Sequence, residues 1–244
     1  MKITLLGTSG GIPITGRAQS GILVETSENK ILLDCGMGIP LRSAERGVMA
    51  EDIDIVCITH EHLDHIQDLP SLTKASWLRR DAANYKIITP PGLEEKLKKF
   101  WRSVDEYERS DLEFEALEPG EELEETASIE AFQTEHTEIS QGYKLSIDGK
   151  SVVYTGDTEP SRIVTEVSKN VDLLIHELSF LERKEGHTNP QDFISKFSDV
   201  KVDRFIMTHF YPEIAERAEE ITDKIEKDIG TPTLPADDLQ TVYI

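Results

Sequence analysis

The sequence predicts a mixed α/β fold, and three observations lead to this prediction. Short apolar runs rich in Ile, Val and Leu recur along all 244 residues, as buried strands do. Amphipathic stretches with helical spacing separate some of these runs. The runs are numerous enough to require at least one large sheet. A chain of this length can bury one sizeable core, so we expect a single domain spanning residues 1–244.

Two pairs of the expected strands are joined by tight turns. The segment 26–29 (TSEN) and the segment 147–150 (IDGK) each contain turn-forming residues between two apolar runs, which predicts hairpins. Later runs alternate with helical patterns. The expected strands cover residues 2–7, 20–25, 30–34, 53–59, 85–89, 141–147, 150–156, 171–176, 203–209 and 239–244.

Helices are predicted from apolar residues that recur on one face and from one start signal. Asn189 before Pro190 has the chemistry of a helix N-terminus. Two apolar faces have the spacing of a helix. One consists of Leu93, Leu97, Phe100, Trp101 and Val104, and the other of Ile214, Ala218, Ile221 and Ile225.

Charge and composition limit the possible partners. The chain has 26 basic and 47 acidic residues, a net charge of −21, which opposes sequence-independent attraction to nucleic acid or anionic lipid. Residues 105–130 hold twelve acidic residues and one basic residue, and we interpret them as a solvated face. Basic residues gather between Lys74 and Arg102, so a local contact with an anion stays possible.

Compartment and redox state follow from two further features. No apolar run approaches the about 18 residues of a membrane span, and no secretory leader is recognisable, so we expect no membrane partner and a cytoplasmic protein. Cys35 and Cys57 form neither a disulfide framework nor a zinc spacing. Both are expected to be reduced thiols that pack in the core.

The segment His60-Glu61-His62-Leu63-Asp64-His65 predicts a metal centre. It places three imidazoles and a carboxylate within six residues directly after a strand. Imidazole nitrogen and carboxylate oxygen suit zinc and similar metals. On an extended backbone His60 and His62 point to the same side and can bind one ion, which leaves Asp64 and His65 for a second. Three residues next to other strands can complete the set: His136, Asp157 and His209.

These motifs, taken with their order along the chain, resemble the metallo-β-lactamase superfamily. The resemblance covers HEHLDH, His136, the TGDT of residues 155–158 and His209. It implies an αββα sandwich, with two mixed sheets packed face to face and helices outside. It also implies two divalent metal ions, zinc by expectation, although manganese or iron would fit. The implied ligands are His60, His62 and His136 for one ion, Asp64, His65 and His209 for the other, and Asp157 as a bridge, with Asp34 supporting the site from behind.

Within that superfamily the C-terminal half resembles the ribonuclease Z and phosphodiesterase branch. The matching segments are VVYTGDTEP, VDLLIHELSF, GHTNPQDF and FIMTHF. The branch implies hydrolysis of a phosphodiester by water activated between two metal ions. It pairs Glu177 with His187, which can protonate the departing alkoxide. Asp64 is expected to steer the attacking water as well as to bind metal.

The substrate stays open between several classes. Only 21 positions separate His136 from Asp157, which leaves room for a hairpin and not for the long tRNA-binding arm of many ribonuclease Z enzymes. RNA and a cyclic or small phosphodiester therefore remain near-equal predictions. An alternative is a hydrolase of carboxylic esters, lactones, thioesters or sulfate esters on the same metals, and a less favoured one is a non-catalytic metal-binding scaffold. The resemblance also suggests a homodimer, with an apolar face around Trp77 and Leu78.

Overall fold

The computed structural model describes residues 1–80, 85–103, 112–124 and 127–244, and these residues form two sheets that pack face to face. Each sheet has seven strands within the described ranges. In spatial order the first contains β14 (Gln240–Tyr243), β1 (Lys2–Gly7), β2 (Gly21–Glu25), β3 (Lys30–Leu33), β4 (Ile55–Cys57), β5 (Lys86–Thr89) and β6 (Glu113–Ala116). The second contains β13 (Thr233–Pro235), β12 (Phe205–Thr208), β11 (Leu173–Glu177), β10 (Lys150–Tyr154), β9 (Gln141–Ile147), β8 (Ser128–Gln133) and β7 (Glu122–Glu124).

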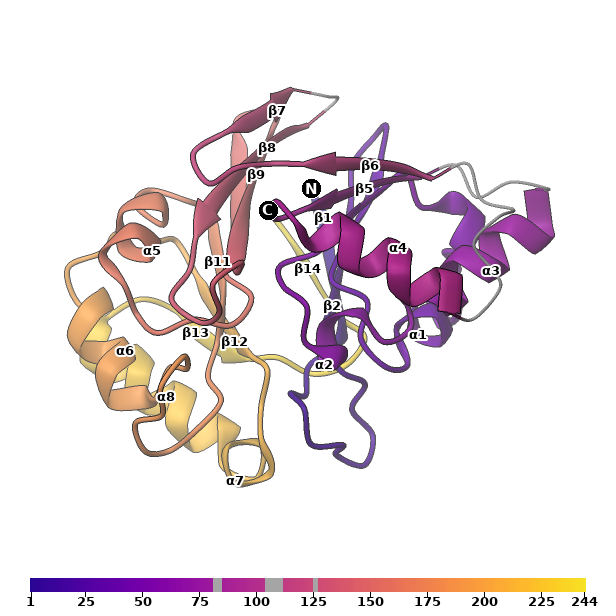
Figure 1. Ribbon diagram of the computed structural model, residues 1–244. Helices are drawn as coiled ribbons and strands as arrows, with labels where there is room; N and C mark the ends of the chain where they lie inside the picture. The colour runs from indigo at the N-terminus through magenta and orange to yellow at the C-terminus, as the bar shows by residue number, and fades with distance from the viewer. Residues whose placement is uncertain (81–84, 104–111, 125–126) are drawn as a thin grey trace.

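Both sheets are mixed, and helices cover their outer faces (Figure 1). Strands β3 to β6 run parallel to one another, as do strands β10 to β13. The hairpins β2–β3 and β9–β10 are antiparallel. The expected αββα sandwich is therefore confirmed. The helical elements are α1 (Ile39–Glu45), η1 (Ala50–Asp52), α2 (Leu63–Ile66), α3 (Leu69–Arg80), α4 (Leu93–Ser103), α5 (Arg162–Val167), α6 (Pro190–Phe197), α7 (Pro212–Ala215) and α8 (Ala218–Ile229).

Side chains point alternately to the two faces of each strand, and this creates the layers of the fold. In β2, Ile22 and Val24 join the core between the sheets, where Tyr143 from β9 also lies. Leu23 points the other way and packs in the outer core with Trp101 of α4. In the first sheet, each central strand therefore contributes apolar side chains to two cores, which explains the nearly continuous apolar runs in that part of the sequence.

The helix predictions were confirmed with two corrections. Asn189 caps α6, because its side chain accepts hydrogen bonds from two backbone N–H groups in the first turn. On α4, Phe100 is 39% exposed and lies off the buried face, and Val104 lies outside the described residues. The face from Ile214 to Ile225 is buried as expected, but it is divided between α7 and α8.

Four strands were not predicted: β6, β7, β8 and β13. Two of them, β6 and β7, fall in the acidic stretch and form edges of the two sheets. Their glutamates point largely to solvent, as at Glu113 and Glu122. Charge on an edge strand discourages pairing with other chains. Within the described residues of the acidic stretch, these glutamates are therefore solvated, as predicted, but they lie on strands.

Two other expectations concern the core and the surface. Cys35 and Cys57 are buried free thiols. On α3, Leu78 is 63% exposed and Trp77 is partly buried. Among the described residues, no helix combines the length and the apolar character needed to cross a membrane.

Candidate metal centre

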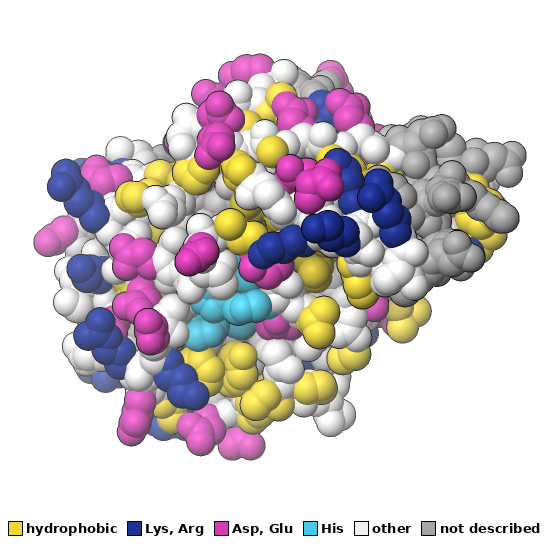
Figure 2. Space-filling view, viewed as in Figure 1, with side chains coloured by type: hydrophobic (Ala, Val, Ile, Leu, Met, Phe, Trp, Pro, Cys, Tyr) yellow, Lys and Arg dark blue, Asp and Glu magenta, His cyan; other side chains and the backbone are white. Residues whose placement is uncertain are grey.

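Strand ends from both sheets gather the chemistry-bearing residues at one place. His60 follows β4, His136 follows β8, Asp157 follows β10, and His209 follows β12, while Glu177 is the last residue of β11. Parallel neighbours end at the same edge of a sheet, and loops there leave side-chain atoms accessible while the strands fix their position. Histidine side chains reach the surface near the centre of the face shown in Figure 2.

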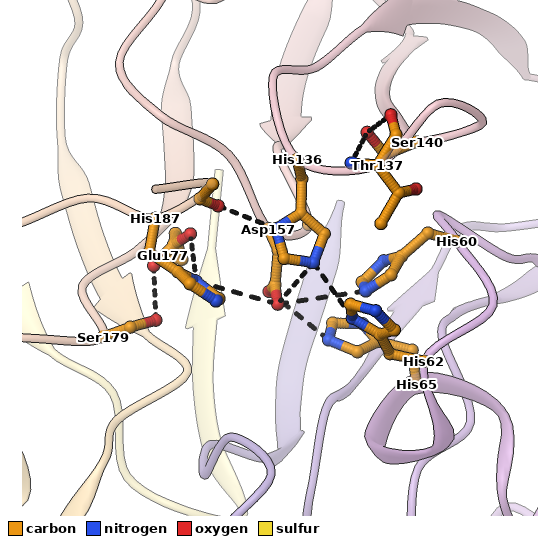
Figure 3. Close-up of polar contacts among 12 residues, drawn as sticks. His60, His62, His65, His136, Thr137, Ser140, Asp157, Glu177, Ser179 and His187 are labelled. Atoms are coloured by element: carbon orange, nitrogen blue, oxygen red, sulfur yellow. Dashed lines mark hydrogen bonds and ion pairs between the residues drawn. The ribbon is translucent and has the colours of Figure 1, made fainter. Parts of the chain in front are cut away.

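One group of potential ligands consists of His60, His62, His136 and Asp157. Their ligand atoms lie within 4.8 Å of one another. Asp157 Oδ2 is 3.9 Å from His60 Nε2 and 3.7 Å from His136 Nε2, and His136 Nε2 is 3.0 Å from His62 Nδ1 (Figure 3). Ligands about 2.0–2.1 Å from a tetrahedral zinc ion stand roughly 3.3 Å apart, so these spacings suit one ion.

A second group consists of Asp64, His65 and His209, and it shares Asp157 with the first. Asp157 Oδ1 lies 3.3 Å from His65 Nε2 and 3.2 Å from His209 Nε2. Asp64 Oδ2 is 3.2 Å from His209 Nε2. The two oxygens of Asp157 therefore face different ligand groups, which is the arrangement a bridging carboxylate needs.

Asp34 orients the histidines from behind, as predicted. Its Oδ2 accepts hydrogen bonds from His65 Nδ1 at 2.7 Å and from the Tyr154 hydroxyl at 2.8 Å. The Thr59 hydroxyl donates to Asp34 and lies 3.0 Å from His60 Nδ1, from which it can accept. These contacts turn the Nε2 atoms of His60 and His65 toward the centre, because the outer nitrogen of each ring holds the proton.

Two further histidines are oriented in the same way. His136 Nδ1 donates to the backbone oxygen of Gly186 at 2.7 Å. His209 Nδ1 lies 2.9 Å from Ser179 Oγ, whose own proton goes to Glu177, so the ring nitrogen donates to the hydroxyl. In both rings Nε2 is left with a lone pair that faces the centre.

The residues present fit a divalent metal ion. Within the described part of the chain, His60 Nε2 and Asp157 Oδ1 are buried atoms without a hydrogen-bond partner. Burial, reinforced by the neighbouring imidazoles, holds the pKa of His60 well below its usual value, and burial also lowers the pKa of His136. Burial opposes ionisation of Asp157, but the nearby His209 and His65 outweigh it and lower its pKa. His60 and His136 are therefore neutral beside an ionised carboxylate, as metal binding requires. Burial disfavours the imidazolium of His65, but Asp157 and Asp34 outweigh burial and raise its pKa, so this ring would release a proton when a cation binds.

His187 and Glu177 form the predicted pair at the edge of this centre. His187 Nδ1 donates to Glu177 Oε1 at 3.0 Å and lies 4.0 Å from Asp157 Oδ2. Glu177 is fully buried and also accepts from the backbone N–H of Thr158 at 2.8 Å and from the Ser179 hydroxyl. Burial disfavours the imidazolium of His187, but the Glu177 carboxylate outweighs this and raises its pKa.

The structure also separates one residue from the site and adds another. His176 directly precedes Glu177 in β11, but its ring packs against Phe193 and Phe197 in the core. Adjacent residues of a strand point to opposite faces, which explains the difference. Ser179, which the sequence reasoning missed, contacts both Glu177 and His209. The one sequence feature that could have indicated this role is the position of Ser179, two residues after Glu177.

Comparisons with known proteins agree with this fold. Residues 29–210 match the family described as the beta-lactamase superfamily domain. Ribonuclease Z of Mycobacterium bovis is 31% identical over 90% of this chain and 89% of its own length, and that of Mycobacterium marinum is 30% identical over 88% of each chain.

Solved structures show the same fold along the whole chain. The metallo-beta-lactamase fold protein YhfI from Bacillus subtilis superposes with a TM-score of 0.86, at 23% identity over 99% of this chain and 98% of that one. The short form of human tRNase Z gives a TM-score of 0.79 at 21% identity over 100% of this chain and 99% of that one.

The fold and the clustered His and Asp residues define a metal-dependent hydrolase. The chain belongs to the beta-lactamase superfamily, with the metallo-β-lactamase fold.

Proposed function

We propose that this protein is a phosphodiesterase that works with two divalent metal ions. One observation carries the proposal: His187, held by a buried carboxylate, lies 4.0 Å from the Asp157 oxygen, and Asp157 is shared by both ligand groups. A proton donor is thus placed beside a centre that can hold two cations. A purely structural metal site closes its coordination and needs no such donor.

The ligands divide between the two ions as their spacing suggests. Two bound ions would activate water and neutralise charge on the phosphate oxygens. Zinc fits the donor set, and manganese or iron would fit it as well. We assign His60, His62 and His136 to one ion, Asp64, His65 and His209 to the other, and Asp157 to both.

His187 would protonate the leaving oxygen, and Glu177 would hold its ring in place. Breaking a phosphodiester with an alkoxide leaving group requires a proton, whereas a leaving group of low pKa needs little help. Asp64, at the open side of the second ligand group, would also position the attacking water. The pair of His187 and Glu177 therefore favours a phosphodiester over an activated ester.

RNA is the substrate class that the relatives favour, because the two mycobacterial proteins named above are called ribonuclease Z. One local contact is compatible with a polyanion despite the net charge of −21. Lys96 of α4 pairs with Glu61 inside the ligand motif, with Nζ 2.9 Å from Oε1, and so places an ammonium group close to the centre. A small or cyclic phosphodiester would enter the same site, since β9 and β10 form a short hairpin in place of an arm.

Hydrolysis of bis(p-nitrophenyl) phosphate tests the proposal. The purified protein should release p-nitrophenolate, a chelator should abolish the reaction, and zinc or manganese should restore it. Carboxylic esters, lactones and thioesters assayed in parallel serve as comparison substrates. Turnover of one of these by metal-loaded protein that leaves the phosphodiester intact would overturn the proposal.

A further inference from the structure

A pocket of about 430 Å³ adjoins the metal centre on the side of the proton donor. Three loops build it: Ile12 lies on the loop after β1, Phe180 follows β11, and Tyr211 follows β12. The centre and the pocket share Ser179, which contacts Glu177.

The position of the pocket relates it to the leaving group. The Phe180 ring lies edge-on to His187 with centroids 5.2 Å apart, and the Tyr211 ring lies 6.4 Å from His187. In Figure 3, His187 and Ser179 lie on one side of Asp157, and His60 and His62 lie on the other. Because His187 would protonate the leaving oxygen, whatever is attached to that oxygen must extend past the imidazole toward this pocket.

The walls of the pocket suit a flat aromatic group. Phe180 and Tyr211 pack together with centroids 4.4 Å apart and planes inclined by 31°, and Lys184 Nζ lies 4.4 Å from the Phe180 centroid. Ile12 adds an apolar side chain that is 49% exposed. Nucleobases stack on aromatic side chains whatever their sequence, and a cation nearby suits the adjoining phosphates.

The backbone is shaped to admit the Tyr211 ring. A Cβ atom at Gly10 would lie 2.6 Å from Tyr211 Cε2 and 2.8 Å from His209 Cε1. Both contacts are too close for any side chain, so glycine at this position allows the ring to lie against the loop. Gly10 and Tyr211 therefore pack closely together in this wall of the pocket.

We propose that this pocket binds the nucleobase of the nucleotide that leaves when the phosphodiester is cleaved. The proposal rests on the proposed phosphodiesterase function and adds to it a nucleotide as the leaving side of the substrate. Phe180, Tyr211 and Ile12 provide the surface for the base, and the ribose oxygen lies at His187. A base on the opposite side of the phosphate has no role in this pocket.

Three dinucleoside monophosphates test the proposal: one with both bases, one abasic on the leaving side, and one abasic on the other side. Loss of the leaving-side base should lower kcat/KM about tenfold, and loss of the other base should not. Phe180→Ala should lower kcat/KM about tenfold more for the complete substrate than for the leaving-side abasic substrate. Phe100→Ala on α4 is the matched control, and Tyr211→Phe, which keeps the ring, should retain the preference.

Ligand binding gives a second readout that does not depend on turnover. In saturation-transfer NMR, adenosine base protons should receive saturation from the wild-type protein and lose it with Phe180→Ala, while ribose gives no signal. Equal kcat/KM for all three dinucleotides, or an equal loss by Phe180→Ala on each, would overturn the base pocket. If bis(p-nitrophenyl) phosphate is hydrolysed in that case, only the pocket assignment fails. If no phosphodiester is hydrolysed, the proposed function fails.

Discussion

His187 Nδ1 lies 3.0 Å from Oε1 of Glu177, a carboxylate with no exposed surface. The same carboxylate accepts the proton of Ser179, which in turn accepts from His209. One buried group thus orients both the expected proton donor and one expected metal ligand. Geometry alone allows a competing role, because His187 also lies near Asp157 and His209 in a possible ligand group.

Replacing His187 with alanine separates these two roles. If His187 is the acid, His187→Ala should lower turnover of an RNA or alkyl phosphodiester by about 10²–10⁴-fold, since the alkoxide then leaves unprotonated. The loss should be much smaller for a p-nitrophenyl ester. Metal content, measured by plasma mass spectrometry, should stay at the wild-type value. Loss of metal in this variant would instead identify His187 as a ligand.

Glu177→Gln should move the pH profile. The carboxylate raises the pKa of His187 against the effect of burial, and a general acid acts in its protonated form. Activity on an alkyl phosphodiester should therefore fall as the pH rises through this pKa. In Glu177→Gln the fall should begin at lower pH, and in the surface control Glu166→Gln it should not move. An unchanged alkaline limit in Glu177→Gln would show that another group sets it.

Asp34→Asn tests the support behind the centre. Asp34 has a positive φ of 59°, a conformation that asparagine also tolerates, so the fold should persist. The amide is a weaker acceptor for His65 Nδ1, and metal affinity should fall by about 10–100-fold. Competition with a chromophoric chelator measures this affinity, and circular dichroism checks the fold. Wild-type affinity in a folded variant would contradict the role of Asp34.

Asn189→Ala should destabilise the fold by about 1 kcal/mol, the usual cost of losing a helix cap. Asn189 Oδ1 accepts from the backbone N–H groups of Gln191 and Asp192, both at 3.0 Å. Urea denaturation measures the change, and Lys196→Ala on the exposed side of α6 is the control, expected to stay within about 0.5 kcal/mol. Equal stability of the two variants would show that the cap contributes little.

The candidate centre was largely predictable because its potential ligands are dense in the sequence. HEHLDH closely follows β4, and the other potential ligands, such as His209, follow strand ends that the topology brings to one edge. Ser179 was not predictable in the same way. A serine acquires its role here only from contacts with Glu177 and His209, and the latter lies 30 residues further along the chain.

The strands inside the two sheets were predictable apart from β8, whereas three of the four edge strands, β6, β7 and β13, were not. Strands such as β4 are buried on both faces and read as continuous apolar runs. In β7, by contrast, Leu123 lies between two exposed glutamates, so the composition does not indicate a strand. The strand forms through its pairing with β8. The division of one apolar face into α7 and α8 also has no clear sequence signal.

Titration of metal-free protein with zinc, followed by assay of phosphodiester hydrolysis at each step, tests the central claim most directly. With Asp157 shared between two ligand groups, activity should rise until two equivalents per chain are bound and then stay constant. Full activity at one equivalent, or hydrolysis that does not depend on added metal, would contradict a centre that works with two ions.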